Sequence, residues 1–213
     1  MKKSLLFILF FIYTSISAQL SYSFNYKLKL KSEEKSESVK NFYQLVNSKI
    51  LHYNLYIAND INGDLIDTQR NTVAHIYIDK EDSKLKYDFL DHLKVPELYK
   101  YNINNDHISI DEIEPNKFSI KCYEEDAKNP NLEFIVNLEP LEDDLIRFYN
   151  VTFNDDLHIK ITNSLKEKLN GNFNYYIREY TMKDKEGLKK YSIEKPIKVN
   201  LNLINTLKEE VIP

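Results

Sequence analysis

Histidine is the residue type here with the widest chemical range, because a neutral imidazole can ligate a metal ion or carry a proton near neutral pH. The five histidines are His52, His75, His92, His107 and His158. They are scattered, and none has the close His or His-Glu spacing that puts two zinc ligands on one element. We predict structural or surface roles for all five and assign no metal site.

Acidic residues gather at three places where the chain is expected to turn. The clusters are Glu124-Glu125-Asp126, Glu142-Asp143-Asp144 and Asp155-Asp156. Loops rich in carboxylates can bind calcium, but none of these has the alternating oxygen spacing of a calcium loop. Solvated turns are the simpler interpretation. A glycosidase would need two carboxyl groups about 5–10 Å apart, which the sequence does not establish.

Cys122 is the only cysteine in the sequence, so the chain forms no internal disulfide. In the stretch "FSIKCYEE" it shares a strand face with Phe118 and Ile120. Nothing nearby in the sequence would lower its pKa and make it a nucleophile. We therefore predict that Cys122 is a small buried apolar residue.

The three glycines, Gly63, Gly171 and Gly187, all stand in turn-like settings. A Rossmann loop, a P-loop and a glycine-flanked nucleophile elbow all need glycines that this chain lacks. A serine triad assembled from distant residues stays open, because geometry rather than spacing defines it. No catalytic residue and no cofactor is assigned, and we expect a protein that is not an enzyme.

Aromatic residues are the most suggestive feature of the composition, with 16 Tyr and 11 Phe but no Trp. Tyrosines along one face of a curled sheet can form an amphipathic pocket for a lipid or another apolar ligand. The alternative is that the rings fill a core or decorate strands, where aromatic residues are favoured in any case.

The first 18 residues have the layout of a secretory signal peptide. Lys2 and Lys3 precede the apolar run "SLLFILFFIY", which is too short to cross a bilayer comfortably, and small and polar residues lead to Ala18. Cleavage after Ala18 removes two of the 29 basic residues and none of the 33 acidic ones, leaving a mildly acidic chain. We expect a soluble exported protein, periplasmic or extracellular, with no nucleic-acid partner and no integral membrane segment in the mature chain.

Period-two alternation dominates the rest of the sequence and predicts strands. In "YSFNYKLKL", five apolar residues fall on one face: Tyr22, Phe24, Tyr26, Leu28 and Leu30. The stretch "NFYQLVNSKILHYNLYIAND" reads as two strands around Asn47 and Ser48, although its first part also fits a helix face. The stretch "YDFLDHLKVPELYKY" interrupts the alternation and predicts a helical turn or a short helix near Asp91.

Hairpin registers follow from the rule that facing residues share a sheet face. Loops at residues 80–83, 126–130 and 154–156 match apolar residues with apolar residues. The predicted pairs are Ile78 with Leu85, Ile76 with Tyr87, Cys122 with Phe134, Ile120 with Val136, Phe153 with Leu157, and Val151 with Ile159.

Two further features concern the last third of the chain. A three-residue turn at 169–171 would pair Leu165 with Tyr175 and place Gly171 in the left-handed region. The last strand, residues 191–203, contains Pro196, which has no N–H for a ladder. That strand should therefore lie at an edge or bend at Pro196.

Together these elements predict an all-β fold, a single domain over residues 19–213. It is an antiparallel meander of roughly nine to eleven strands, curled into a half-barrel or barrel-like sheet, with at most one short helix. A closed barrel and a sandwich stay open as alternatives.

A curled sheet with an aromatic interior resembles the periplasmic lipoprotein carriers and related lipid-binding half-barrels. The resemblance implies an exported binding protein that holds an apolar or lipid-like ligand on an aromatic concave face. One alternative is an envelope structural or interaction protein that docks through its edge strands. A secreted hydrolase and an outer-membrane barrel are less favoured, the latter because several strands are too short or too charged to face lipid.

Overall fold

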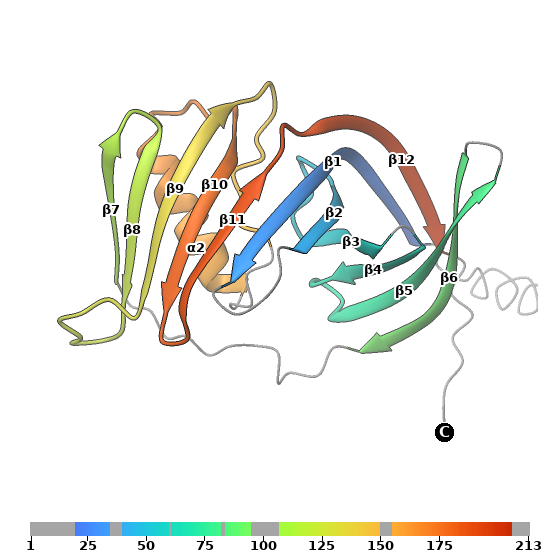
Figure 1. The fold of residues 1–213 in the computed structure, drawn as a ribbon, viewed down its shortest axis with the longest axis horizontal. Coiled ribbons are helices and arrows are strands. Elements are labelled where there is room, and N and C mark those ends of the chain that lie inside the picture. The colour runs from blue at the N-terminus through green and yellow to red at the C-terminus, as the bar shows by residue number, and fades with distance from the viewer. Residues whose placement is uncertain are drawn as a thin grey trace, which may run out of the picture.

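The computed structural model describes residues 20–34, 40–59, 61–81, 84–94, 107–149 and 155–205. In these ranges it contains one twelve-stranded antiparallel sheet and one helix (Figure 1). The strand order is β6-β5-β4-β3-β2-β1-β11-β10-β9-β8-β7, with β12 paired to β1 beside this path. The sheet is open, so the predicted meander curled into a half-barrel is confirmed, with one strand beyond the expected number.

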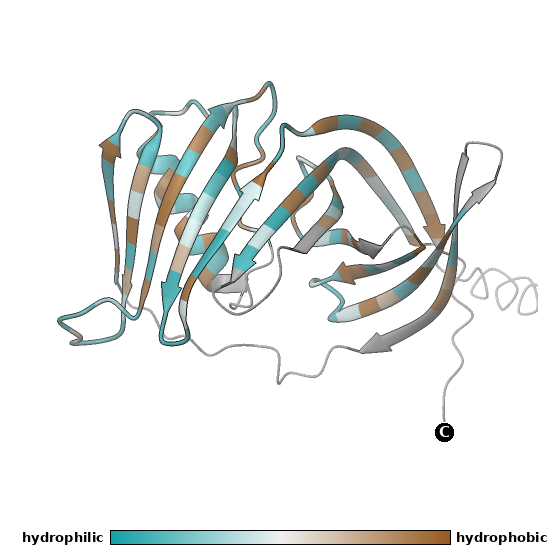
Figure 2. Cartoon of the chain, viewed as in Figure 1, coloured by the Kyte–Doolittle hydropathy of each residue, from teal (hydrophilic) through white to brown (hydrophobic). Residues whose placement is uncertain are grey.

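The strands alternate in hydropathy along most of their length (Figure 2). They are β1 (Leu20–Glu34), β2 (Lys40–Val46), β3 (Tyr53–Asn59), β4 (Asn62–Asp67), β5 (Thr72–Glu81), β6 (Lys84–Lys94), β7 (His107–Glu114), β8 (Lys117–Tyr123), β9 (Leu132–Pro140), β10 (Tyr175–Asp184), β11 (Gly187–Ile193) and β12 (Ile197–Asn205). The helix is α2 (Asp155–Glu167). Among the described residues, no helix is both long and apolar enough to cross a bilayer.

Strand β1 is the centre of the fold, because it pairs with β2, β11 and β12. Its alternation is confirmed: Tyr22, Phe24, Tyr26, Leu28 and Leu30 are each at most 3% exposed. One half of β1 pairs with β12 and the other half with β11. Strands β11 and β12 are separated by residues 194–196, which include Pro196 and belong to neither strand. The predicted bend at this proline is confirmed.

The buried apolar residues form two clusters. The helix core combines residues of β1, β2, β7 to β11, α2 and the segment 145–149. The strand core combines residues of β1 to β5 and β12. Strand β2 joins the two, since Phe42 and Val46 belong to the helix core while Leu45 belongs to the strand core. The strand predicted just before Asn47 and Ser48 is therefore confirmed as β2, and it is buried on both faces.

Helix α2 replaces a predicted hairpin, and this is the largest correction to the sequence-based fold. Leu157 and Ile159 were expected to pair with Phe153 and Val151, which lie outside the described residues. Instead Leu157, Ile161 and Leu165 stand one helical turn apart and are buried, while Ile159 is 52% exposed. A helix is favoured because this stripe covers the inner apolar face of the sheet, which a further hairpin would leave open.

The turn at 169–171 follows a helix, so the predicted pairing of Leu165 with Tyr175 is wrong. Leu165 lies in α2, and Tyr175 faces Pro140 of β9. The left-handed conformation predicted for Gly171 is confirmed, with φ at 83°. Glycine is favoured there because the chain reverses just after a helix end.

The other two hairpin registers differ from prediction by two residues. Ile78 faces Tyr87 and Ile76 faces Phe89, while Ile120 faces Phe134 and Cys122 faces Leu132. A slip of two residues keeps every side chain on its face. Alternation therefore identifies the face of a strand but not its exact partner.

The helix expected near Asp91 is also wrong as far as the described residues extend. Asp91 lies in β6, opposite His75, and the register shifts between His75 and Ile76. The interrupted alternation therefore marks a β-bulge, which adds one residue to a strand. Leu90, at the bulge, is 63% exposed.

Candidate functional site

The inner face of strands β7 to β11 is covered by a cap, defined here as the segment 145–149 together with helix α2 (Figure 1). The segment follows β9 and joins the sheet through one isolated parallel bridge between Leu145 and Tyr176. All five of its residues are buried. Helix α2 then adds Leu157, Ile161 and Leu165 to the same core. Helix α2 thus packs on the sheet through side chains, whereas the segment is also held by the backbone, with the Leu145 amide donating to the Tyr175 oxygen at 2.9 Å.

Aromatic rings fill the space between the sheet and the cap. Phe148 of the cap lies 5.0 Å from Phe134 and 5.2 Å from Tyr180, measured between ring centroids. Tyr180 stacks on Tyr191 at 4.7 Å, and its hydroxyl donates to the backbone oxygen of Tyr149. The aromatic rings on the inner face of the sheet therefore fill a core, which is the alternative interpretation of the aromatic composition, and the cap packs directly against them.

Arg147 is a buried cation in this apolar surrounding, with 6% of its surface exposed. Its Nη2 donates to the backbone oxygen of Asn47 at 2.7 Å. Its Nε has no hydrogen-bond partner among the described residues. The nearby carboxylate of Asp144 is engaged elsewhere, since it pairs with Lys166 and accepts from the Ile146 amide.

Three more polar side chains are grouped with Arg147, and the four together are called the polar cluster: Arg147, Tyr149, His158 and Thr162. The charge of Arg147 acts on Tyr149 and on His158, and Thr162 follows His158 by one turn of α2. The hydroxyls of Tyr149 and Thr162 are buried and have no hydrogen-bond partner in the described part of the chain. Burial raises the pKa of Tyr149 to about 12. His158 Nε2 accepts from the Phe148 amide at 3.2 Å. Burial and the charge of Arg147 lower the pKa of His158 to about 4, so its imidazole is neutral at pH 7.

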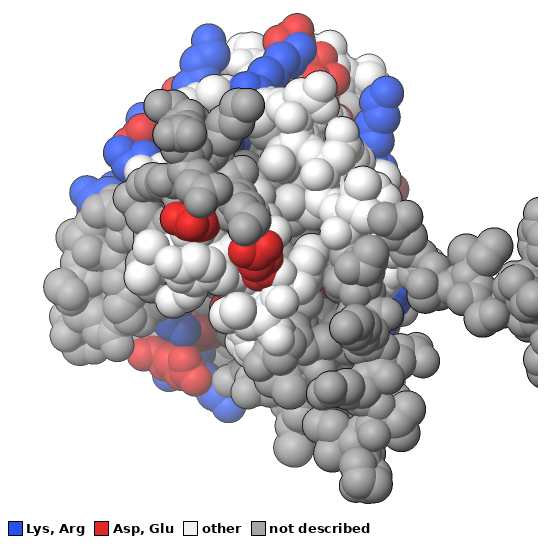
Figure 3. All heavy atoms as spheres, turned by 90° about the vertical axis from the view of Figure 1, so that its right-hand side faces the viewer, with Lys and Arg blue, Asp and Glu red and all other residues white. Residues whose placement is uncertain are grey.

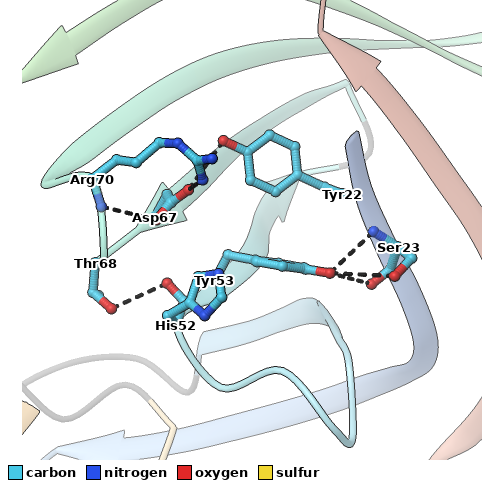
Figure 4. Close-up of polar contacts among 7 residues, drawn as sticks. All are labelled: Tyr22, Ser23, His52, Tyr53, Asp67, Thr68 and Arg70. Carbon is cyan, nitrogen blue, oxygen red and sulfur yellow. Dashed lines mark hydrogen bonds and ion pairs between the residues drawn. The ribbon is translucent and has the colours of Figure 1, made fainter. Parts of the chain in front are cut away.

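A second polar network lies at the end of the strand core (Figure 4). Asp67, 1% exposed, accepts from the Tyr22 hydroxyl at 3.2 Å, from Arg70 Nη1 at 2.6 Å and from the Arg70 amide at 3.1 Å. The Tyr53 hydroxyl donates to the backbone oxygen of Ser23 at 2.9 Å and accepts from the Ser23 amide at 3.1 Å. Burial, with Asp67 alongside, raises the pKa of Tyr22 to about 12. These groups satisfy one another, so the network is structural.

Asn47 connects the cap to the strand core. Its backbone oxygen accepts from Arg147, and its Nδ2 donates to the backbone oxygen of Ser23 at 2.9 Å. Its Oδ1 accepts from the amides of Lys49 and Ile50, which shapes the β2–β3 loop. Arg147 is thereby held at the junction of the two cores.

The histidines are dispersed in the structure as they are in the sequence. His75 Nδ1 lies 2.6 Å from an oxygen of Asp64. His107, on β7, stands beside Tyr123 of β8, and the backbone oxygen of His52 accepts from Thr68. His92 lies in β6, and its side chain is outside the described part. Of the five, His158 alone joins the polar cluster. Among the described residues, no three His, Cys, Asp or Glu side chains form a group that could hold a metal ion.

The acidic clusters and Cys122 take mostly the places expected of them. Glu124 to Asp126 lie at the turn after β8, and Glu142 to Asp144 lie in the loop after β9. Asp155 and Asp156 begin α2, so their predicted turn is wrong. Cys122 is fully buried, and burial raises the pKa of its thiol to about 12, which confirms its structural role.

Sequence reasoning missed Arg147, Tyr149 and Thr162. One signal was available in the stretch "LIRFY", where an arginine stands in an apolar run. Buried arginines are rare without a partner, but only the folded chain shows that this one is buried.

The Asp67 network gives a first testable prediction. Asp67→Ala removes the acceptor of a buried hydroxyl and of Arg70, and we expect it to lower the free energy of unfolding by about 2 kcal/mol. Urea denaturation of the purified protein measures this. Asp64→Ala, on the same strand but with 44% of its side chain exposed, is the matched control and should cost less than about 0.5 kcal/mol. Equal losses in the two variants would contradict the structural role of Asp67.

Comparisons with known proteins assign this chain to no family. No family model matches it, and no curated protein does. Among solved structures, a LolA superfamily protein from Nitrosomonas europaea aligns over 84% of this chain and 87% of its own, with 8% identity and a TM-score of 0.23. Values this low establish neither a shared fold nor a shared ligand.

Proposed function

We propose that this chain is an exported binding protein whose inner aromatic face takes an apolar, lipid-like ligand in the place where helix α2 of the cap lies. The observation that carries the proposal is the construction of the cap. It covers an aromatic face with side chains from one 13-residue helix and one bridged segment.

A cap of this kind can be displaced without unfolding the sheet. Helices shorter than about 12–15 residues are marginal in isolation and derive their stability from packing. Each of the eleven strands on the main path of the sheet, by contrast, is hydrogen-bonded to its neighbours. Local opening of α2 therefore breaks side-chain contacts and leaves the ladders in place.

An acyl chain can supply the contacts that the cap gives up. The helix contributes three buried aliphatic side chains, Leu157, Ile161 and Leu165, to the core. Burial of each stabilises by about 1.5–3 kcal/mol, and each buried methylene of a ligand contributes about 0.8 kcal/mol. A chain of about ten methylenes thus matches the three side chains.

The edges of the sheet give less support to docking by strand addition. Strand β7 ends the sheet on one side, and its exposed Asp111, Glu112 and Glu114 discourage another strand from pairing there. Figure 3 shows the opposite side of the molecule, where the described charged residues are of both signs and lie mostly toward the margins. Among the described residues that this view shows, no large patch of a single sign offers such a partner a matching surface.

A catalytic function has no supporting arrangement in the described residues. The polar cluster contains a neutral histidine, but its Nε2 accepts from a backbone amide. Among the described residues, no hydrogen bond joins a serine or Cys122 to a histidine. The cluster is therefore better suited to binding than to nucleophilic chemistry.

The test is native mass spectrometry of residues 19–213 exported into a periplasm, together with solvent extraction of the purified sample. We expect an adduct of lipid-like mass at a ratio of one per chain. After delipidation, added dodecanol should bind and should speed amide hydrogen exchange in α2, leaving β8 to β10 protected. A bare mass, with no dodecanol bound and no change in exchange, would refute the proposed function.

A further inference from the structure

We propose that the part of the polar cluster on the bridged segment 145–149 binds the anionic head group of the ligand, with the Arg147 guanidinium as the cation and the Tyr149 hydroxyl as a further donor. This inference rests on the proposed function and specifies its ligand: a single-chain amphiphile that ends in a carboxylate or a phosphate. The apolar chain would occupy the aromatic face beside the cluster.

The first argument is the unbalanced charge of Arg147. A guanidinium stays protonated in proteins, so burial cannot neutralise it, and buried charges are normally paired. Arg147 is 6% exposed and forms no ion pair with a carboxylate among the residues that the structure describes. Its Nη2 bond to the Asn47 oxygen holds the group in position but adds no negative charge.

The acids closest in sequence do not fill this role. Asp144 pairs with Lys166, and Asp143 accepts from the Tyr26 hydroxyl at 2.6 Å and lies 4.0 Å from Lys198. The local acids are thus already balanced by lysines. The charge of Arg147 is therefore left for an anionic ligand to balance.

The second argument is the chemistry of the unpartnered atoms. Arg147 Nε, the Tyr149 hydroxyl and the Thr162 hydroxyl each lack a hydrogen-bond partner among the described residues, and their side chains are 5–6% exposed. All three can donate, and one carries charge. Carboxylate and phosphate oxygens only accept, and an arginine binds them with two parallel bonds. Few buried polar atoms lack a partner in native structures, so two such donors on one segment, Arg147 Nε and the Tyr149 hydroxyl two residues later, indicate a ligand.

The third argument is the position of the cluster beside the aromatic face. Phe148 stands between Arg147 and Tyr149 in the chain and packs on Phe134 and Tyr180. The donors therefore border the apolar face itself, and a molecule with an anionic end and an acyl chain suits both.

The experiment compares four ligands of equal chain length on the delipidated protein: laurate, dodecyl phosphate, dodecanol and dodecyltrimethylammonium. We expect laurate or dodecyl phosphate to bind at least tenfold more tightly than dodecanol, and the cation to bind most weakly. The tighter of the two anions identifies the head group.

Variants locate the head-group site. Arg147→Gln should weaken anion binding at least tenfold and change dodecanol binding less than threefold. Arg178→Gln, which removes a half-exposed arginine of β10, is the matched control and should leave both affinities unchanged. Because Arg147→Gln also disturbs the bond to Asn47, two gentler variants are needed.

Tyr149→Phe and Thr162→Val remove the unpartnered hydroxyls with little change of shape. Tyr149→Phe should weaken laurate binding about threefold to tenfold, whereas Thr162→Val, on the helix that opens, should change it less than threefold. Both should leave the ligand-free melting temperature unchanged or raised, because each removes a buried polar atom without a partner. A lowered melting temperature would show that the hydroxyls are bonded within the protein, and would overturn the inference. Equal affinities for laurate and dodecanol would overturn it too, leaving the proposed function intact. Binding of none of the four ligands would refute the proposed function itself.

Discussion

Ile161→Ala will lower the free energy of unfolding by about 2–5 kcal/mol, whereas Ile159→Ala, two residues away, will change it by less than about 0.5 kcal/mol. Ile161 is fully buried in the helix core and Ile159 is 52% exposed. The first variant therefore leaves a cavity between α2 and the sheet, and the second removes a solvated side chain. Urea denaturation at pH 7 measures both.

This pair of variants also tests the secondary structure. On a strand, residues 159 and 161 would share a face, and the two substitutions would have similar costs. On a helix they lie on different faces, so the costs separate. Losses of equal size would therefore contradict the placement of α2 on the inner face, and with it the cap on which the proposed function depends.

Lowering the pH from about 6.5 to about 4 will destabilise the protein through His158. Its pKa is about 4 in the folded chain, below the ordinary 6.5, because burial and then the charge of Arg147 disfavour the imidazolium. In this window the unfolded chain binds a proton that the folded chain does not, so stability falls as the pH falls. The contribution is complete above pH 6.5 and fully lost below pH 4. At about 1.4 kcal/mol per pH unit, the loss is on the order of 3 kcal/mol.

The measurement is the free energy of unfolding at several pH values between 4 and 7.5, for the wild type and for His158→Gln. Carboxylates that titrate below about pH 5 contribute to both curves, so the histidine appears in their difference. The wild-type curve should fall more steeply, whereas His107→Gln, which removes an exposed histidine, should follow the wild type. Parallel curves for wild type and His158→Gln would show that His158 is solvated.

The sequence was sufficient to determine which face of most strands is buried. In β1 each apolar residue from Tyr22 to Leu30 falls on the inner face, because side chains alternate strictly along a strand. The bend at Pro196 and the left-handed Gly171 were equally predictable, since each follows from the covalent structure of one residue. The burial of Cys122 follows from the same alternation.

Tertiary structure decided the hairpin registers and the helix. Slips of two residues preserve every face, so loop geometry and packing selected Ile78 opposite Tyr87 and Ile120 opposite Phe134. Residues 157–161 fit a strand as well as a helix. Leu157, Ile159 and Ile161 are two residues apart, as on one face of a strand, while Leu157 and Ile161 are four apart, as on one face of a helix. The helix is favoured because its apolar side chains bury the inner apolar face of the sheet, which would otherwise be exposed to water.

The polar cluster is also a product of the tertiary structure. Arg147 is hydrogen-bonded to Asn47, 100 residues away in the chain. His158 and Thr162 stand on α2, a helix in a stretch where the alternating pattern predicted a hairpin. Spacing in the sequence reports on neighbours within one element, whereas this cluster joins a cap segment and a helix and is bonded to the β2–β3 loop through Asn47. The sequence alone determined where the apolar surfaces lie. The fold decided which polar groups are enclosed between them, because burial and partnership depend on contacts between distant segments.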